Sequence, residues 1–284
     1  GGVMRYGIHL PQFGQASGPE AVTKAAVHAE ELGYDDIWVS DHLAVPKDAK
    51  YPPTAYIHEP IVTLTWAAAV TKRVGLGTSV LVLPMRRPLV LAKMLSSLDL
   101  MSGGRLIIGA AAGWLREEFD ALGVPFNERG KRTDETLKMM RACWTEDPVN
   151  FDATATGGQM VNMRANPRPN RPIPIWVGGM SDAALNRAIT FGDGWHASGS
   201  NTDDLTDRIA KLRAARPEED FTISARQHWD PLGDSKGDDV DDMKRQIAEF
   251  REIGVQHLMF QPRQRYADDW HRSVEMLWDM TRGA

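Results

Sequence analysis

The sequence predicts a parallel (β/α)8 barrel, an α/β fold in which helices surround a closed sheet. Short apolar or β-branched runs alternate with longer amphipathic runs, which is the pattern of buried parallel strands covered by helices. Eight such units fit into 284 residues, close to the roughly 250 residues of a barrel that forms a single domain. An open doubly wound sheet would show much the same pattern strand by strand. We expect one domain over residues 1–284.

The expected strands are short and apolar, and they cover residues 6–10, 36–40, 75–80, 106–110, 173–178, 194–197, 222–227 and 257–261. The expected helices cover residues 19–32, 60–71, 88–101, 115–122 with 131–144, 181–191, 203–214, 240–253 and 267–280. Pro19, Pro60 and Pro88 suit a first helical turn, and Gly33 and Gly254 lie where a helix should end. In the Ser102-Gly-Gly-Arg105 loop, a glycine is most simply a left-handed helix stop.

One segment, residues 149–174, interrupts the alternation. A glycine turn between alternating residues predicts a hairpin, and the four prolines that follow it predict an extended strap. The segment joins the fourth helix to the fifth strand, so it leaves from the barrel face opposite the loops that follow the strands. We interpret it as an insertion that serves as connecting scaffold.

Composition excludes several classes of protein. A net charge of −5 without a dense Lys/Arg block gives no nucleic-acid footprint. No run of about 18 apolar residues predicts a membrane span. The single cysteine, Cys143, is interpreted as a buried hydrophobe, and a reducing cytoplasm fits best. No Cys/His spacing indicates a metal site, no Gly-x-Ser-x-Gly elbow occurs, and no Gly-x-Gly-x-x-Gly follows the first strand.

Barrel enzymes carry their sites in the loops after the strands, and these loops are polar or rich in glycine here. Several of them carry strings that resemble the luciferase-like flavin monooxygenases and, more closely, the branch of oxidoreductases that use the deazaflavin coenzyme F420. The strings are Trp38-Val-Ser-Asp-His42, Gly77-Thr-Ser-Val-Leu81, Arg87-Pro with Ala92-Lys93, Ser102-Gly-Gly-Arg105, Gly113-Trp-Leu115 before Glu117-Glu118, and Pro174-Ile-Trp-Val-Gly-Gly179 followed by Gly192-Asp-Gly-Trp195.

The resemblance implies a cofactor site at several strand ends. Asp41 and His42 resemble the pair beside the flavin-like ring, with His42 as the acid/base; the alternative is a polar helix-capping pair. Thr78, Ser79 and Val80 end the third strand, where the family places a non-proline cis peptide behind the ring, between Ser79 and Val80. Gly113, after the fourth strand, is assigned to the same cofactor site.

The cofactor phosphate is expected at Gly178-Gly179-Met180-Ser181, where glycine permits close approach and a helix N-terminus offers free N–H groups. The alternative there is a tight turn with Ser181 or Asp182 as N-cap.

Substrate contacts are expected from His9, Trp114, Trp195 and Trp229, which lie at or near strand ends. Some of the nine tryptophans could instead belong to the core, and His9, His196 and His228 are equally consistent with structural histidines. Sugar-phosphate dehydrogenases of the superfamily carry an acidic residue where this chain has Trp114, so the resemblance does not extend to a sugar-phosphate substrate.

Three functions are compatible with these residues. The first is hydride transfer between coenzyme F420 and a small organic substrate. The second is monooxygenation with reduced FMN and oxygen, and the third is flavin or deazaflavin binding without turnover. The resemblance also implies a homodimer.

Overall fold

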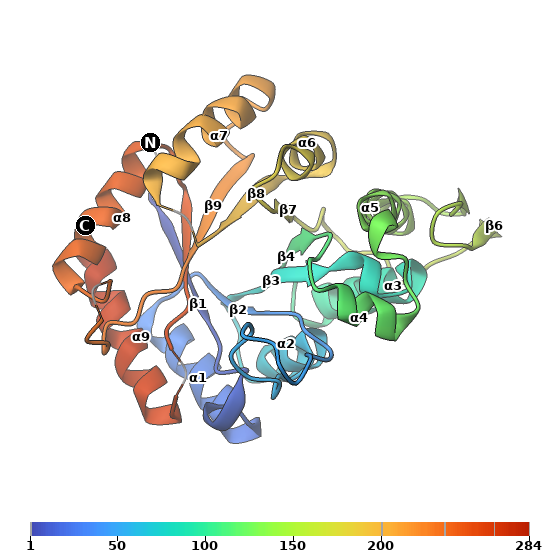
Figure 1. The fold of residues 1–284 in the computed structure, drawn as a ribbon. Helices are drawn as coiled ribbons and strands as arrows, with labels where there is room; N and C mark the ends of the chain where they lie inside the picture. The colour runs from blue at the N-terminus through green and yellow to red at the C-terminus, as the bar shows by residue number, and fades with distance from the viewer. Residues whose placement is uncertain (1, 200, 236, 264, 284) are drawn as a thin grey trace.

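A closed parallel barrel forms the centre of the protein (Figure 1). The computed structural model describes residues 2–199, 201–235, 237–263 and 265–283. The barrel strands in spatial order are β1 (Arg5–His9), β2 (Asp36–Val39), β3 (Gly75–Val82), β4 (Leu106–Ala111), β7 (Ile175–Gly178), β8 (Gly194–Ser198), β9 (Thr222–Gln227) and β10 (His257–Phe260). Strand β10 pairs in parallel with β1, which closes the sheet. The predicted barrel is confirmed, and the open sheet is excluded.

Helices surround the barrel in the order expected from the sequence (Figure 1). They are α1 (Pro19–Leu32), α2 (Pro60–Ala69), α3 (Pro88–Met101), α4 (Arg116–Leu122), α5 (Arg129–Thr145), α6 (Asp182–Phe191), α7 (Thr202–Ala215), α8 (Val240–Glu252) and α9 (Ala267–Arg282). Gly33 follows α1 with a φ of 109°, a left-handed conformation that glycine adopts without steric cost. None of the described helices is both long and apolar enough to cross a membrane.

The insertion contains the predicted hairpin, formed by β5 (Val149–Asp152) and β6 (Gln159–Met163). It lies outside the ring of helices, beyond α5 (Figure 1). Glu135 of α5 fixes its loop, because the carboxylate accepts the backbone N–H groups of Ala155 and Thr156 at 2.9 and 2.6 Å. The hairpin is therefore attached to the outer surface of the barrel.

One indole fills much of the barrel interior. Trp38 of β2 is fully buried, and glycines on the two neighbouring strands make room for it. A Cβ atom at Gly77 would lie 2.3 Å from Trp38 Cδ2, and one at Gly7 would lie 2.4 Å from Trp38 Nε1. Real Cβ atoms do not approach other atoms so closely, so both positions require glycine. The interior is consequently packed around Trp38, with Trp176 beside it.

Candidate active site

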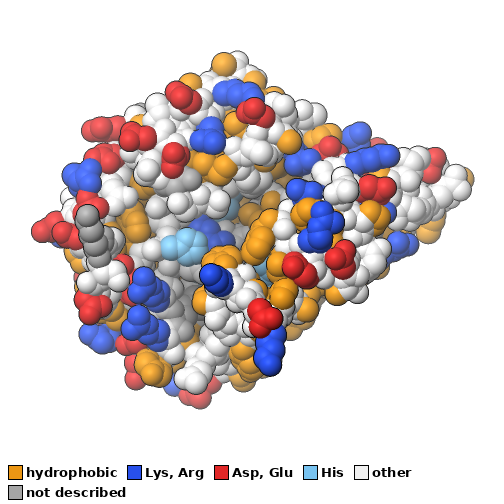
Figure 2. All heavy atoms as spheres, in the orientation of Figure 1, with side chains coloured by type: hydrophobic (Ala, Val, Ile, Leu, Met, Phe, Trp, Pro, Cys, Tyr) orange, Lys and Arg blue, Asp and Glu red, His pale blue; other side chains and the backbone are white. Residues whose placement is uncertain are grey.

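A cavity of about 1070 Å³ opens at the ends of the strands, with walls formed by the loops that follow them. Figure 2 shows this hollow at the centre of one face, with histidine and arginine side chains inside it. Its volume is slightly above the range of about 300–1,000 Å³ that is typical of small-molecule and cofactor sites.

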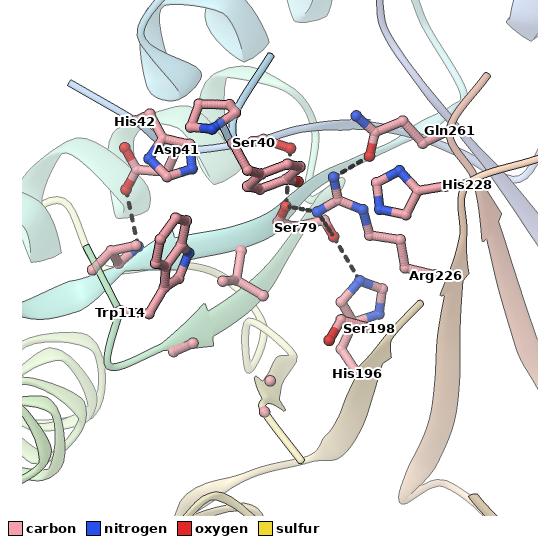
Figure 3. Close-up of a pocket in the computed structure, with 18 of the residues that line it drawn as sticks. Ser40, Asp41, His42, Ser79, Trp114, His196, Ser198, Arg226, His228 and Gln261 are labelled. Atoms are coloured by element: carbon pink, nitrogen blue, oxygen red, sulfur yellow. Dashed lines mark hydrogen bonds between the residues drawn. The ribbon is translucent and has the colours of Figure 1, made fainter. Parts of the chain in front are cut away.

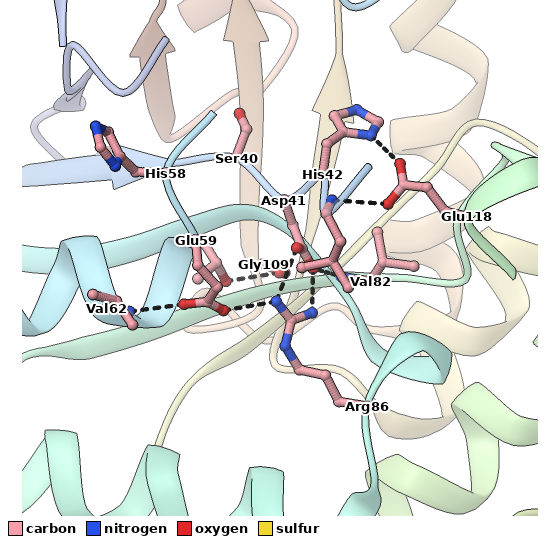
Figure 4. A network of polar contacts seen from close by, with 12 residues as sticks. Ser40, Asp41, His42, His58, Glu59, Val62, Val82, Arg86, Gly109 and Glu118 are labelled. Carbon is pink, nitrogen blue, oxygen red and sulfur yellow. Dashed lines mark hydrogen bonds and ion pairs between the residues drawn. The ribbon is translucent and has the colours of Figure 1, made fainter. Parts of the chain in front are cut away.

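His42 lies at the cavity wall and is oriented by Glu118 (Figure 4). Its Nδ1 donates to Glu118 Oε1 at 2.5 Å, and the other carboxylate oxygen accepts the backbone N–H of Leu43 at 3.0 Å. Glu118 is 2% exposed, so this carboxylate is fixed in one place. Among the described residues, none forms a hydrogen bond with Nε2 of His42, which the predicted acid/base role requires to be accessible to a ligand. Trp114 packs edge-on against the imidazole at 6.0 Å.

The Asp41 carboxylate also borders the cavity, but its contacts point away from it (Figure 4). Arg86 binds it through both terminal nitrogens at 2.5 and 2.9 Å, and the Val82 N–H donates at 2.9 Å. Burial raises the pKa of Asp41, and Arg86 opposes that shift. Arg86 also binds Glu59 at 2.8 Å. Asp41 thus ties the end of β2 to β3 and positions His42.

The Ser79–Val80 peptide bond is cis, as the resemblance implied. Both residues line the cavity, and the Ser79 carbonyl accepts from Ser40 Oγ at 3.1 Å and from Arg226 at 2.7 Å (Figure 3). A Cβ atom at Gly178 would lie 2.8 Å from Val80 Cγ1. Glycine here keeps the surface beside Val80 open. Thr78 is not in the lining; its buried hydroxyl donates to the Gly109 carbonyl at 2.9 Å.

The part of the lining at the start of α6 is suited to an anion. Gly178, Gly179 and Ser181 line the cavity at the N-terminus of α6, and Gly113 lines it nearby. Ser181 is the N-cap of α6, where it accepts the Ala184 N–H at 3.2 Å, so the predicted N-cap is confirmed. The anion site at the same turn stays a prediction. The arginines Arg129 and Arg187 lie at the same part of the lining.

Met180 is the member of this predicted loop that lies outside the lining. Its side chain packs against the core, and its carbonyl accepts from Arg208 at 2.9 Å.

Arg226 supplies a positive charge at the cavity floor (Figure 3). It donates to Ser79 and to the Gln261 side chain, and no carboxylate of the described residues forms an ion pair with it. Burial lowers the pKa of Arg226 to about 10, and desolvation followed by the Arg226 charge lowers that of His228 to about 4. At neutral pH, Arg226 is charged and His228 is neutral.

Three predicted pocket residues lie elsewhere. Trp195 is fully buried on the outer side of β8, where its indole N–H donates to the Gly179 carbonyl at 2.8 Å. Trp229 stacks on Phe260 in the core with ring centroids 5.5 Å apart. His9 is fully buried behind Ser40, with Nε2 2.8 Å from Ser40 Oγ. Placing these side chains in the pocket was wrong, whereas Trp114 lines the cavity and is 54% exposed.

Strand alternation explains both the errors and the residues that were missed. Successive side chains of a strand point to opposite faces, so in β8 the cavity residues His196 and Ser198 put Trp195 on the outside. In the same way, Arg226 and His228 face the cavity and place Trp229 outside. This period-two pattern was readable in the sequence and would have identified Arg226.

The buried histidines His9 and His196 predict acid sensitivity. Burial holds both pKa values well below 6.5, so the folded state stays neutral while the unfolded chain takes up protons as pH falls below 6.5. Acid therefore lowers the free energy of unfolding. At pH 5.5 each histidine costs about 1.4 kcal/mol relative to a pH well above 6.5. Urea unfolding measures the free energy of unfolding at pH 7.5 and at pH 5.5. The decrease between the two pH values should be larger by about 1 kcal/mol for the wild type than for His9→Gln. Equal drops would contradict the assignment for His9.

The closed barrel with a deep, partly apolar cavity over its strand ends is the arrangement of a (β/α)8 barrel enzyme. Residues 4–276 match the model of the luciferase-like monooxygenase family, and the chain belongs to that family. An uncharacterized protein of Mycobacterium tuberculosis is 34% identical over 76% of this chain and 77% of its own length. An F420-dependent glucose-6-phosphate dehydrogenase of Amycolatopsis mediterranei is 34% identical over 68% of this chain and 57% of its own.

Solved structures show the same fold at lower identity. A monooxygenase from Streptomyces bottropensis has a TM-score of 0.79 at 21% identity and covers 98% of both chains. An F420-dependent secondary alcohol dehydrogenase, solved with an F420-acetone adduct, has a TM-score of 0.78 at 19% identity and covers 96% of this chain and 99% of its own.

Proposed function

We propose that the protein transfers a hydride between coenzyme F420 and a small organic substrate. The observation that carries this proposal is the charge of the cavity. Five of its described lining residues are arginines, whereas the one carboxylate among them, Asp41, is bound to Arg86. Two of the five are paired with carboxylates outside the lining, Arg187 with Asp134 at 2.6 Å and Arg263 with Asp230 at 3.9 Å, which leaves three arginines without an ion pair among the described residues. F420 carries a phosphate and several carboxylates on its side chain, whereas FMN carries a single phosphate. A cavity with this excess of positive charge favours the more anionic cofactor.

The residues present fit such a cofactor. Val80 and Gly178 form an apolar surface that a flat ring can contact, because Gly178 has no side chain to cover it. The α6 N-terminus lies where it can bind a phosphate, and Arg187 lines the cavity with its Nε bound to Asp134 at 2.6 Å. When bound, the deazaflavin would supply a ring carbon that accepts or donates a hydride. The chain's own task is to orient the two reactants and to supply or remove a proton.

His42 is proposed as the group that handles this proton. Its Nδ1 is committed to Glu118, so proton exchange with the ligand takes place at Nε2. In the oxidation of an alcohol, His42 would take the proton from the hydroxyl oxygen, while the hydride leaves the carbon that carries this hydroxyl group.

The substrate is proposed to be a small alcohol or the corresponding ketone. Trp114 and Tyr51, with ring centroids 6.0 Å apart, form an aromatic wall beside His42. A wall of this kind suits an apolar group next to the reacting carbon. The alcohol dehydrogenase with the F420-acetone adduct shows that the fold accommodates this chemistry in another protein. Trp114 in place of an acidic residue argues against a sugar phosphate.

Titration with both cofactors tests the proposal. Fluorescence titration should give a Kd for F420 at least tenfold below that for FMN, and the difference should shrink as salt screens the arginines. Absorbance assays with 2-propanol and F420 should then show reduction of the cofactor. Tighter binding of FMN, with oxygen uptake in its reduced form, would replace this proposal by the monooxygenase reaction. Binding of F420 without turnover on any small alcohol or ketone would indicate a carrier.

A further inference from the structure

A line of buried polar side chains runs from the cavity floor through the barrel interior. It begins at Ser79, whose Oγ lies 2.7 Å from His196 Nε2 (Figure 3). The other ring nitrogen of His196, Nδ1, lies 2.7 Å from Ser224 Oγ, and Ser224 Oγ lies 2.8 Å from His257 Nδ1. The line ends where His257 Nε2 lies 2.7 Å from Asp36 Oδ1. Each link has the length of a good hydrogen bond.

The line is insulated from solvent along its whole length. None of its five members is more than 2% exposed, and only the first two line the cavity. The Trp38 ring lies parallel to the His196 ring at 5.3 Å and also contacts His257 at 5.4 Å. Burying two serines, two histidines and a carboxylate inside a barrel is costly unless all are hydrogen bonded. The continuous line satisfies that requirement.

The two ends of the line fix the direction of every hydrogen bond. At the cavity end, Arg226, which can only donate, lies 3.3 Å from Ser79 Oγ. At the other end, Asp36 Oδ1 also accepts the indole N–H of Trp38 at 2.5 Å. With an accepting carboxylate at the bottom, neutral His257 must carry its proton on Nε2. Ser224 then donates to His257, which requires the proton of His196 on Nδ1, and Ser79 donates to His196.

We propose that this line is a relay that exchanges one proton between the cavity and the interior of the barrel. A proton donor of the bound ligand other than the hydroxyl group served by His42 gives its proton to Ser79 Oγ while the Ser79 proton moves to His196 Nε2. The His196 Nδ1 proton moves to Ser224, and the Ser224 proton moves to His257 Nδ1. One proton has left the ligand, and His257 has become an imidazolium bound to Asp36. The reverse sequence returns the proton, so Ser79 accepts in one state and donates in the other.

The use of the relay in turnover rests on the proposed hydride transfer, which releases a proton in one direction and consumes one in the other. Ser79 adjoins Val80, which forms the proposed ring surface, so the relay opens beside the reactants. The existence of the relay does not depend on the cofactor. The histidine tautomers of the ligand-free protein therefore test it independently.

The first experiment is a long-range ¹⁵N–¹H NMR spectrum of ligand-free, ¹⁵N-histidine-labelled protein at pH 8. Signals are assigned with His196→Asn and His257→Gln. We expect His257 as the neutral Nε2–H tautomer and His196 as the neutral Nδ1–H tautomer. Two histidines in the same tautomer, or any other combination, would break the required order of donors and acceptors and overturn the relay. This result stands whether or not F420 binds.

The second experiment interrupts the relay with Ser224→Ala, at a residue that does not line the cavity. Its matched control is Ser273→Ala, another fully buried serine, whose hydroxyl has no hydrogen-bond partner among the described residues. We expect Ser224→Ala to lower kcat about 10- to 100-fold, which is at or below the lower limit of the roughly 10²- to 10⁴-fold usual for a side chain that transfers a proton to the reactant directly. The Kd for F420 should stay within about twofold, and the solvent deuterium isotope effect on kcat should rise. The control should match the wild type.

An unchanged kcat in Ser224→Ala would overturn the catalytic use of the relay. A lower kcat with an unchanged solvent isotope effect would do the same, because it would assign Ser224 a role in packing alone. Absence of any turnover by the wild type with F420 would instead contradict the proposed function, and the NMR experiment would then decide on the relay.

Discussion

Replacing His42 by alanine is expected to lower kcat by about 10²- to 10⁴-fold, the usual contribution of a positioned acid or base. The imidazole lies at the cavity wall and is held through Nδ1 by buried Glu118, so it is positioned to exchange a proton with a ligand through Nε2. Binding of the cofactor should change little, because the proposed ring and phosphate contacts come from other strands. Steady-state kinetics with F420 and 2-propanol, together with a fluorescence titration, separates the two effects.

The matched control for this experiment is His271→Ala. His271 lies on α9 outside the barrel, where its ring stacks on that of His28 with centroids 4.9 Å apart. Its replacement by alanine is expected to leave kcat unchanged. Equal losses of kcat and of cofactor affinity in His42→Ala would show that the imidazole binds the cofactor rather than transferring a proton. Restored turnover with added imidazole would support the acid/base role.

Replacing Asp41 by alanine is expected to lower the free energy of unfolding by about 3–5 kcal/mol, the usual cost of removing one partner of a buried ion pair. The Asp41 side chain is fully buried, and among the described residues the change leaves Arg86, which is 13% exposed, with Glu59 as its one remaining ionic partner. It also removes the acceptor of the Val82 N–H. Urea unfolding followed by circular dichroism measures the loss.

An exposed ion pair provides the comparison for Asp41. In the pair of Asp147 with Arg164 the arginine is 76% exposed, so Asp147→Ala should cost less than about 1 kcal/mol. Similar losses from the two substitutions would mean that Asp41 is not essential to the end of β2. In that case its carboxylate would be free for the direct cofactor contact first expected from the sequence.

Much of the fold could be predicted because its signals are local. The bounds of α1 and α3 match the prediction, since each helix begins with a proline and ends at a glycine loop or close to one. The eight strands were found because each is a short apolar run between polar segments. Closure of the sheet could only be inferred from the number of units, because the pairing of β10 with β1 joins residues about 250 positions apart.

The site was harder to predict because the residues that contact one another in it come from different βα units of the barrel. Glu117 and Glu118 are adjacent, and the phase of α4 alone decides that Glu118 is buried against His42 while its neighbour is exposed. The partnership of Asp41 with Arg86 likewise depends on how the loop after β3 folds back. The tryptophan errors differ in kind, because strand alternation was available and would have placed Trp195 and Trp229 outside the barrel.

The packing around Trp38 also bears on how this family of sequences can change. Trp38 and His42 belong to one strand and its following loop, whereas the glycines that admit the indole belong to neighbouring strands. A larger residue at Gly77 is acceptable only if a smaller residue replaces Trp38 at the same time. A smaller residue at position 38 leaves a void unless larger residues replace the glycines. These positions should therefore vary together among relatives, although they are far apart in the chain and none of them lines the cavity.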